Sequence, residues 1–200
     1  MNSTISYYND NAEQFINLTK DVDMSQLYRL FEVSIPCGGT ILDVGCGSGR
    51  DSKYFVDNGY IVTAIDGSEV LCKAASKYVG IDVIHMNIEK LDLPGTYDGI
   101  WACASLLHIK KIYMKSVLEE LVGKLNANGV LYASWKYGNS ERRDDGKHYS
   151  DYDEEQLTEL VHNLDVESLK IWIDDDSTRA KTRWINLLIH KGNRLPIKTE

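Results

Sequence analysis

Residues 40–68 read TILDVGCGSGRDSKYFVDNGYIVTAIDGS, and this stretch decides the fold. It opens with a short apolar run, as in a buried parallel strand, and glycines at alternate positions follow Asp43. Residues 50–58 place aromatic and charged side chains on different faces, which predicts an amphipathic helix that ends at Gly59. Residues 60–65 are β-branched and apolar and lead to Asp66, as in a second strand. This order predicts a βαβ unit of an α/β protein.

The glycine loop of this unit, Gly45–Gly49, limits the class of ligand. A phosphate-binding P-loop has a Lys after its last glycine, whereas Arg50 stands there. The dinucleotide fingerprint has a glycine at the position that Arg50 occupies, and the charge of Asp43 is unfavourable beside a pyrophosphate. Asp66 can accept both ribose hydroxyls, and Asp43 can favour an ammonium group. The pattern therefore predicts a nucleoside with a zwitterionic, phosphate-free tail.

Asp43, Gly45, Gly47 and Gly49, followed by Asp66, resemble the motif of the class I S-adenosylmethionine-dependent methyltransferases. The resemblance covers nearly the whole chain and is strongest for small enzymes of the tellurite-resistance and small-molecule group. It implies a Rossmann-like α/β sheet, mostly parallel with an antiparallel terminal strand, and helices on both faces. It also implies S-adenosyl-L-methionine as the cofactor and S-adenosyl-L-homocysteine as its product.

The resemblance further implies which residues bind that cofactor. Met86 and Ile88 would sandwich the adenine, the amide of Asn87 would bind its amino group, and an early tyrosine would cover the site. The alternative for Tyr7 and Tyr8 is an aromatic pair that packs a loose terminus onto the sheet. With the glycine loop and the end of the strand expected at residues 97–103 included, the expected cofactor residues are Tyr8, Asp43, Gly45, Cys46, Gly47, Ser48, Gly49, Arg50, Asp66, Gly67, Ser68, Met86, Asn87, Ile88, Cys103, Ala104 and Ser105.

Composition bounds the other properties of the chain. Its 200 residues, 43% of them hydrophobic, suit one domain, with an N-terminal helical lid at 1–36, a methyltransferase domain at 37–192 and a tail at 193–200. The net charge of −8 disfavours a nucleic-acid partner held by phosphate contacts. A polar start and the lack of a long apolar run predict a cytoplasmic protein without a membrane segment. The four cysteines lack metal-ligand spacing, so we expect free thiols and no metal.

Apolar periodicity predicts the remaining elements. Helices are expected at residues 9–20, 23–31, 68–79, 110–126 and 151–161. Strands are expected at residues 82–86, 97–103, 130–135, 166–173 and 183–190. Asn128 and Gly129 are expected to end the helix at 110–126, and Asp174–Asp176 to form the solvated tip between the last two strands.

Residues 135–149 form the least regular stretch, because it is long, charged and aromatic and has no clear period. Long loops in compact domains tend to be functional or disordered, so this stretch is predicted to bind the methyl acceptor. Arg142, Arg143, Lys147 and His148 would grip an anionic acceptor, and Tyr7 would shape its pocket. The alternative is a solvated loop whose charges pair with its own acidic residues.

His108 and Tyr137 are the candidate catalytic residues. His108 follows the fourth strand, and the unperturbed pKa of a histidine lies near neutrality, which suits a general base. The alternative for His108 is a satisfied residue at a helix terminus. A thiolate or selenolate acceptor needs no base, whereas an oxygen or nitrogen acceptor would need His108, His148 or a tyrosine such as Tyr137.

The expected function is methyl transfer from S-adenosylmethionine to a small-molecule acceptor. One alternative is a methyltransferase that acts on RNA or protein, which the cations of residues 142–147 favour and the acidic net charge disfavours. Another is a protein that binds the cofactor without turnover, which the glycine loop and Asp66 fit equally well. The sequence makes no prediction of the oligomeric state.

Overall fold

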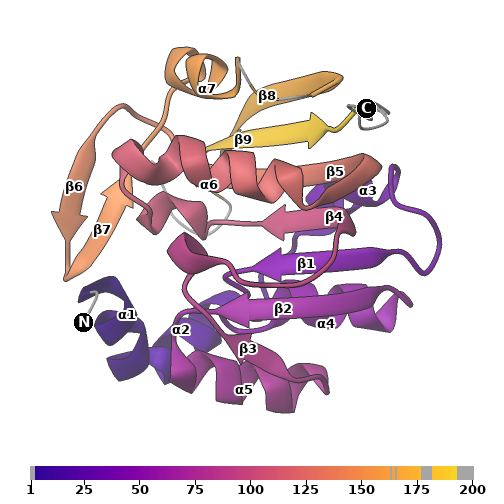
Figure 1. Ribbon diagram of the computed structural model, residues 1–200. Helices are drawn as coiled ribbons and strands as arrows, with labels where there is room; N and C mark the ends of the chain where they lie inside the picture. Colours follow the sequence, from indigo (N-terminus) through magenta and orange to yellow (C-terminus); the bar gives the residue numbers. More distant parts are fainter. Residues whose placement is uncertain (1–2, 163, 165, 177–181, 193–200) are drawn as a thin grey trace.

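The computed structural model describes residues 3–162, 164, 166–176 and 182–192. Seven strands form one sheet in the order β3-β2-β1-β4-β5-β9-β8, and β6 pairs with β7 in a separate hairpin (Figure 1). The strands are β1 (Thr40–Val44), β2 (Ile61–Asp66), β3 (Val83–His85), β4 (Tyr97–Ala102), β5 (Leu125–Lys136), β6 (Glu141–Asp144), β7 (Lys147–Ser150), β8 (Ser168–Asp175) and β9 (Arg183–His190). The helices are α1 (Ser3–Asp10), α2 (Ala12–Thr19), α3 (Ser25–Glu32), α4 (Arg50–Asp57), α5 (Glu69–Val79), α6 (Lys111–Gly123) and α7 (Glu154–Val161), with short 3₁₀ helices η1 (Ile88–Lys90) and η2 (Leu106–His108).

The sheet is parallel from β3 to β5, and β9 runs antiparallel to both of its neighbours. The predicted mostly parallel sheet is therefore confirmed. The antiparallel strand β9 lies between β5 and β8, so the edge strand β8 itself runs with the parallel set. The expected tail at 193–200 lies outside the described residues.

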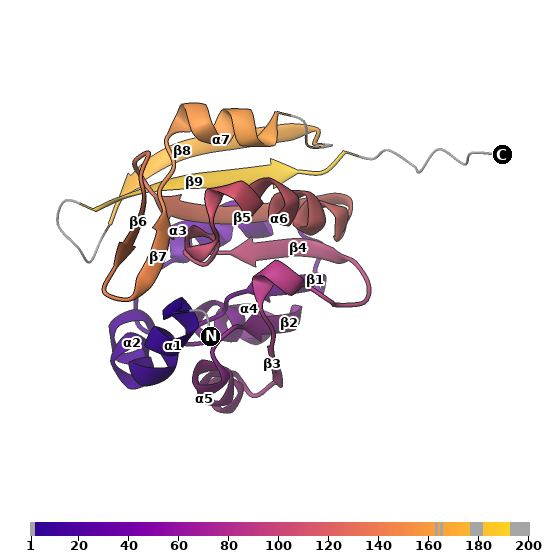
Figure 2. The same cartoon turned by 60° about the vertical axis from the view of Figure 1, so that its left-hand side comes forward.

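Helices cover both faces of this sheet, as Figures 1 and 2 show. Because alternate residues of a strand point to opposite faces, Ile100 and Ala102 of β4 face one core and Trp101 faces the other. The first core packs α6 and α7 through residues such as Leu118. The second core packs α3 and α4 through residues such as Phe55. The predicted helices on both faces are thus confirmed.

The carboxyl ends of β1, β2 and β4 point toward one edge of the sheet. Helices α1 and α2 and the β6–β7 hairpin lie at that edge, on the left in both cartoons (Figures 1 and 2). In open α/β sheets ligands bind outside the carboxyl ends of the strands. Helices α1 and α2 and the hairpin therefore lie around the place where a ligand is expected.

The N-terminal region corrects one prediction. The helix expected at 9–20 is two helices, α1 and α2, which meet at Asn11 with a non-helical φ of −118°. Tyr7 and Tyr8 lie inside α1 and not in front of a helix. The next helix agrees with the prediction, since Ser25 N at its start donates to Asp23 Oδ1 at 2.9 Å.

The α6–β5 connection corrects another prediction. Helix α6 ends at Gly123, and β5 begins at Leu125 instead of residue 130. The register along β4 slips between the Tyr97–Leu125 and Gly99–Val130 pairs, which is a β-bulge. Asn128, with φ of +62°, lies in this bulge and does not end the helix.

Residues 141–150 correct a third prediction, since they form a regular hairpin instead of an irregular loop. Asp145 and Gly146 make its two-residue turn with φ of +49° and +78°. An Asp-Gly pair between two strands is a known signal for this turn type. The hairpin alternates its side chains, so Lys147 and Tyr149 share one face of β7 and His148 takes the other.

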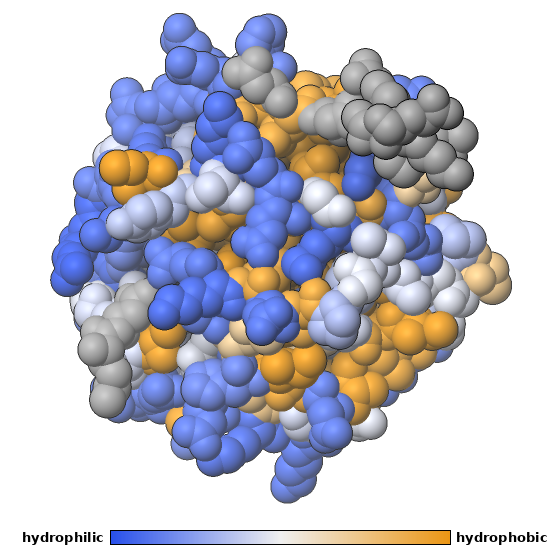
Figure 3. All heavy atoms as spheres, viewed as in Figure 1, coloured by the Kyte–Doolittle hydropathy of each residue, from blue (hydrophilic) through white to orange (hydrophobic). Residues whose placement is uncertain are grey.

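The surface is mixed in character. Figure 3 shows hydrophilic side chains over much of the face seen in Figure 1, with hydrophobic side chains reaching the surface between them.

Cys37, Cys46, Cys72 and Cys103 are all free thiols, as predicted. In the part of the chain that the structure describes, no helix combines the length and the apolar character that crossing a membrane requires. The same residues contain no group of three potential metal ligands.

Candidate functional site

The glycine loop lies directly after β1. Gly45 N and Cys46 N donate to the carbonyl oxygen of Ile65 in β2 at 2.9 and 3.0 Å, so the loop folds against the neighbouring strand. Gly45 and Gly47 have φ of +75° and +55°, in the left-handed region. A Cβ on Gly45 would lie 2.5 Å from Ser105 Cβ, and a Cβ on Gly47 would lie 2.9 Å from the Phe15 ring. Only glycine fits at these two positions, and the bare main chain borders a cavity.

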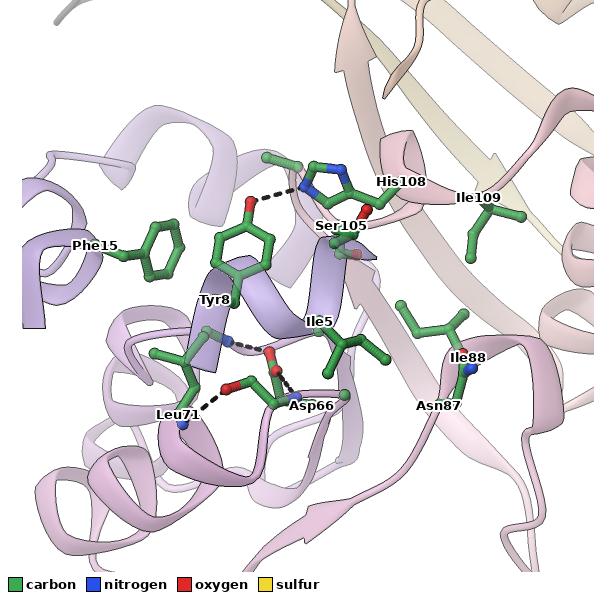
Figure 4. A pocket seen from close by; sticks show the side chains of 16 residues that line it. Ile5, Tyr8, Phe15, Asp66, Leu71, Asn87, Ile88, Ser105, His108 and Ile109 are labelled. Carbon is green, nitrogen blue, oxygen red and sulfur yellow. Dashed lines mark hydrogen bonds between the residues drawn. The ribbon is translucent and has the colours of Figure 1, made fainter. Parts of the chain in front are cut away.

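A cavity of about 100 Å³ lies against this loop, and Figure 4 shows its walls. Asp66 Oδ2 accepts a hydrogen bond from Gly47 N at 2.9 Å, and Asp66 Oδ1 accepts one from Ser68 N at 2.8 Å. A carboxylate has about four acceptor positions, so Asp66 can accept further donors from a ligand. Burial raises the pKa of Asp66, and the two backbone N–H groups act against that rise.

Ser105, just after β4, also faces the small cavity. Its side chain is buried, and Ser105 Oγ has no hydrogen-bond partner among the described residues. A buried hydroxyl without a partner costs about 1–3 kcal/mol, so a ligand that hydrogen-bonds this group would recover that cost. Asn87 and Ile88 line the opposite part of the cavity (Figure 4). Asn87 Oδ1 accepts from Glu89 N at 3.0 Å, which holds the Asn87 side chain at the start of η1.

Helix α1 covers the small cavity and is fastened on two sides. Thr4 Oγ1 accepts from His148 N of β7 at 2.9 Å. On the other side, Ser68 Oγ at the start of α5 donates to Asn9 Oδ1 at 2.6 Å. The side chains of Ile5 and Tyr8 point into the space between these two anchors (Figure 4). The cavity is smaller than the roughly 300 Å³ of a usual small-molecule site, because α1 fills part of it.

His108 contacts α1 through Tyr8. His108 Nε2 lies 2.8 Å from Tyr8 Oη, and His108 Nδ1 lies 2.7 Å from the carbonyl oxygen of His148. Burial lowers the pKa of His108 to about 4, and the nearby Lys147 and Lys136 add to this effect. The imidazole is therefore neutral at physiological pH.

A second cavity of about 800 Å³ adjoins the first. Lys136 Nζ lies 4.0 Å from the centroid of the Tyr149 ring, and Lys147 Nζ lies 3.5 Å from that of Tyr7, so two cations stacked on aromatic rings border this space. Apolar residues of α2, α3 and their connection form another wall: Leu18, Val22, Met24 and Leu27. Both cavities are lined by Tyr8, Phe15, Gly45, Gly47, Ala104 and His108, so the two spaces meet at the end of β4.

The chain was compared with known protein families and with characterised proteins. Residues 41–129 match the family described as "Methyltransferase domain". These residues form a methyltransferase domain. A mitochondrial ubiquinone biosynthesis O-methyltransferase of Schizosaccharomyces pombe is 31% identical over 127 residues, which are 60% of this chain and 45% of that protein. The chain thus spans less than half the length of this curated relative.

Solved structures extend the similarity to more than nine-tenths of the chain. The 1,6-didemethyltoxoflavin-N1-methyltransferase of Burkholderia thailandensis, crystallised with 1,6-didemethyltoxoflavin and S-adenosylhomocysteine, has a TM-score of 0.73 at 19% identity, over 94% of this chain and 85% of that one. TehB of Haemophilus influenzae has a TM-score of 0.71 at 18% identity, over 92% of this chain and 66% of that one. At such identities the likeness concerns the fold, and the predicted class I methyltransferase fold is confirmed.

Most of the predicted cofactor residues border the two cavities of this methyltransferase domain. The small cavity is lined by Tyr8, Gly45, Gly47, Asp66, Gly67, Ser68, Asn87, Ile88, Ala104 and Ser105. The large cavity also reaches Cys46, Ser48, Arg50 and Cys103. Asp43, Gly49 and Met86 line neither cavity.

Asp43 differs most from its expected place. Its carboxylate is buried and accepts a hydrogen bond from Ser52 Oγ of α4 at 2.5 Å, so it faces the helix and not the loop. Burial and the neighbouring Asp51 raise the pKa of Asp43. Gly49, with φ of +80°, instead lets α4 pack on α5, since a Cβ there would lie 3.1 Å from Ala75 Cβ. Asp43 and Gly49 therefore support the packing of the glycine loop and α4 and do not line a cavity.

Some of the residues predicted to bind or activate the acceptor line a cavity, and others do not. Tyr7 and Lys147 line the large cavity, whereas Tyr137, Arg142, Arg143 and His148 line neither. Arg142 pairs with Asp151, and Arg183 lies over the Tyr137 ring at 4.3 Å. The prediction missed Lys136 and Tyr149. The alternation of β7 is the signal for Tyr149, because it points the same way as Lys147.

Proposed function

We propose that this protein is a methyltransferase that transfers a methyl group from S-adenosylmethionine to a small-molecule acceptor. The arrangement of the two cavities carries the proposal. A narrow cavity against the glycine loop and Asp66 meets a wide one at the end of β4. A donor and an acceptor held in these spaces would face each other where the spaces join.

The residues of the small cavity suit the cofactor. Asp66 has acceptor positions for ribose hydroxyls, and Ser105 Oγ supplies a buried donor that no described residue uses. Asn87 and Ile88 offer an amide and an apolar surface for a purine. No cationic side chain lines this cavity among the described residues, which suits a ligand without phosphate groups. The bound cofactor would supply a methyl group attached to a positively charged sulfur.

The large cavity suits the acceptor. Its volume of about 800 Å³ lies within the range of small-molecule sites, which is roughly 300–1,000 Å³. Tyrosine rings, an apolar wall, two lysines and several aspartates line it, so it suits an organic molecule with polar groups. The chain would act chiefly by holding donor and acceptor in line, which can supply several kcal/mol of the barrier.

The N-terminal helices would act as a lid over the domain at 37–192. The hydrogen bonds that Thr4 and Asn9 accept from His148 N and Ser68 Oγ, on the two sides of the small cavity, support this division. Enclosure by a lid excludes water from the reacting groups. A cytoplasmic location fits the four free thiols, which a reducing compartment preserves.

Titration calorimetry with S-adenosylmethionine, S-adenosylhomocysteine and NAD tests the cofactor assignment. We expect binding of the first two and none of NAD. Asp66→Ala should weaken binding by about 1.5–3 kcal/mol, the range for hydrogen bonds to a charged group. Asp57→Asn, an exposed carboxylate on α4, is the matched control and should bind as the wild type does. Wild-type affinity in Asp66→Ala would refute the ribose assignment.

A methyl-transfer screen then tests the activity. Thiols, phenols, amines and carboxylates would be incubated with cofactor carrying a labelled methyl group. Label in any of these products supports the proposal. Tight cofactor binding without product across all four classes would identify a binding protein without turnover, which contradicts it.

A further inference from the structure

The junction of the two cavities holds one pair of groups that can move a proton. Six residues line both spaces, and among them only Tyr8 and His108 carry an ionisable side chain. They lie 100 residues apart in the sequence and meet at 2.8 Å (Figure 4). A proton leaving the acceptor would start from this place.

The hydrogen bonds of His108 determine which ring nitrogen carries the proton. The carbonyl oxygen of His148, 2.7 Å from Nδ1, can only accept, so Nδ1 is the protonated nitrogen. In the neutral ring Nε2 then has a lone pair, and Tyr8 Oη donates to it. The backbone of β7 thereby holds a basic nitrogen toward Tyr8.

The surroundings of the ring keep it neutral. Tyr8 of α1 and Tyr149 of β7 pack against it, at 5.4 and 5.1 Å between ring centroids. The charged or titratable groups that act on it are Lys147, Lys136 and His148, and each disfavours the imidazolium form. His108 is therefore available as a base over the whole physiological pH range, although it is a weak one.

We propose that Tyr8 and His108 form a proton relay that serves a hydroxyl acceptor, an inference that rests on the proposed methyltransferase function. As the acceptor oxygen bonds to the methyl carbon, the carbon–sulfur bond breaks and its electron pair stays on sulfur. The acceptor's hydroxyl proton passes to Tyr8 Oη while the Tyr8 proton passes to His108 Nε2. The products are the methyl ether, the neutral thioether and an imidazolium that later releases its proton to water.

A weak base suffices for this step because the proton leaves the acceptor oxygen only as the oxygen–carbon bond forms. An oxygen that has gained a methyl group but still holds its proton is far more acidic than an imidazolium. The relay would thus act as the new bond forms and not before it. Carboxylates and acidic thiols such as thiophenol are ionised near neutral pH and would need no relay, so the pair would serve phenols and other hydroxyl acceptors.

The relay can be tested without turnover by ¹⁵N NMR of the S-adenosylhomocysteine complex. In the wild type we expect the His108 signals of a protonated Nδ1 and an unprotonated Nε2. Adding phenol should shift the Nε2 signal and leave Nδ1 in place, and Tyr8→Phe should abolish that shift. A His108 ring protonated on Nε2, or a shift that persists in Tyr8→Phe, would overturn the relay.

Turnover provides the second test, with phenol and thiophenol as paired probes. Tyr8→Phe and His108→Asn should lower kcat for phenol by about 10²–10⁴-fold, the usual contribution of general-base catalysis, and leave kcat for thiophenol within a few-fold. His108→Gln keeps an acceptor for the Tyr8 hydroxyl but removes the base, so it should behave like His108→Asn. Tyr113→Phe and His162→Asn, away from both cavities, are the controls.

The outcomes separate the two proposals. Absence of S-adenosylhomocysteine binding in the wild type would defeat the proposed function itself. Binding together with methylation of thiophenol but not of phenol would defeat only the relay. Equal losses for both probes in the variants would show that Tyr8 and His108 shape the site without moving a proton.

Discussion

Trp101 of β4 donates its indole N–H to Asp51 Oδ2 of α4 at 2.8 Å, in the buried core beneath the glycine loop. Tyr28 Oη donates to Asp51 Oδ1 at 2.5 Å, and Arg50 donates to both oxygens at 2.6 and 2.9 Å. The carboxylate of Asp51 thus receives four hydrogen bonds, which fill its acceptor positions. Burial alone would raise the pKa of Asp51, but Arg50 and these donors hold it below its usual range. This cluster anchors the first turn of α4, where the loop ends.

Asp51→Asn should therefore destabilise the fold strongly. The amide would turn a donor toward groups that are themselves donors and would leave the Arg50 charge buried without its partner. We expect a loss of about 3–5 kcal/mol in the free energy of unfolding, as for other broken buried ion pairs. Tyr28→Phe removes one of the four hydrogen bonds and should cost about 1–3 kcal/mol. Urea denaturation measures both, and equal losses would contradict the central role of Asp51.

Helices and strands that begin and end at residues of a characteristic type could be predicted from the sequence. Helix α5 begins where Ser68 Oγ accepts from Leu71 N at 3.1 Å and ends at Gly80 with φ of +88°. Both signals depend on residue type at one position, so the pattern contains them. The βαβ unit around Asp66 is predictable for the same reason.

The parts that depend on contacts between distant residues could not be predicted in the same way. Asp43 resembled a ligand-binding acid, yet its position on β1 turns it toward Ser52 of α4. The place of His108 depends on Tyr8, 100 residues away, and on the backbone of His148. Neither contact leaves a periodic signal in the sequence.

The glycine loop gives the second prediction. Gly45→Ala would place a methyl group 2.5 Å from Ser105 Cβ at a φ of +75°, so it combines backbone strain with a clash. Gly59→Ala has a similar φ of +85° but nothing within 4 Å of its Cβ, which makes it the matched control. Backbone strain should cost each variant about 1–2 kcal/mol. Only Gly45→Ala should also lose binding of S-adenosylhomocysteine in calorimetry. Binding retained by Gly45→Ala would show that the loop does not border the ligand.

The pKa of His108 gives the third prediction. Its value of about 4 in the folded state lies below the usual 6.5, so between these values the unfolded chain binds a proton that the folded chain does not. Stability should therefore fall as the pH decreases from 6.5 to 4, by up to about 3 kcal/mol from this group. His108→Asn removes that contribution and should lose less stability over the same interval. Urea denaturation at pH 7 and pH 4.5 compares the two proteins, and parallel losses would contradict the neutral buried imidazole.

The fastening of α1 gives the last prediction. Helix α1 covers the small cavity of about 100 Å³, so α1 must move aside while a nucleoside ligand enters and can close over it afterwards. Thr4→Val keeps the shape of the side chain but removes the acceptor that His148 N uses. A hydrogen bond of about 1 kcal/mol corresponds to a roughly fivefold change in an equilibrium. Amides of residues 3–10 should exchange about fivefold faster, and S-adenosylhomocysteine should bind faster by a similar factor in stopped flow. Thr158→Val, which removes a comparable hydroxyl from α7, should change neither rate. If Thr4→Val accelerated exchange but left the association rate unchanged, the ligand would enter by a route that α1 does not close.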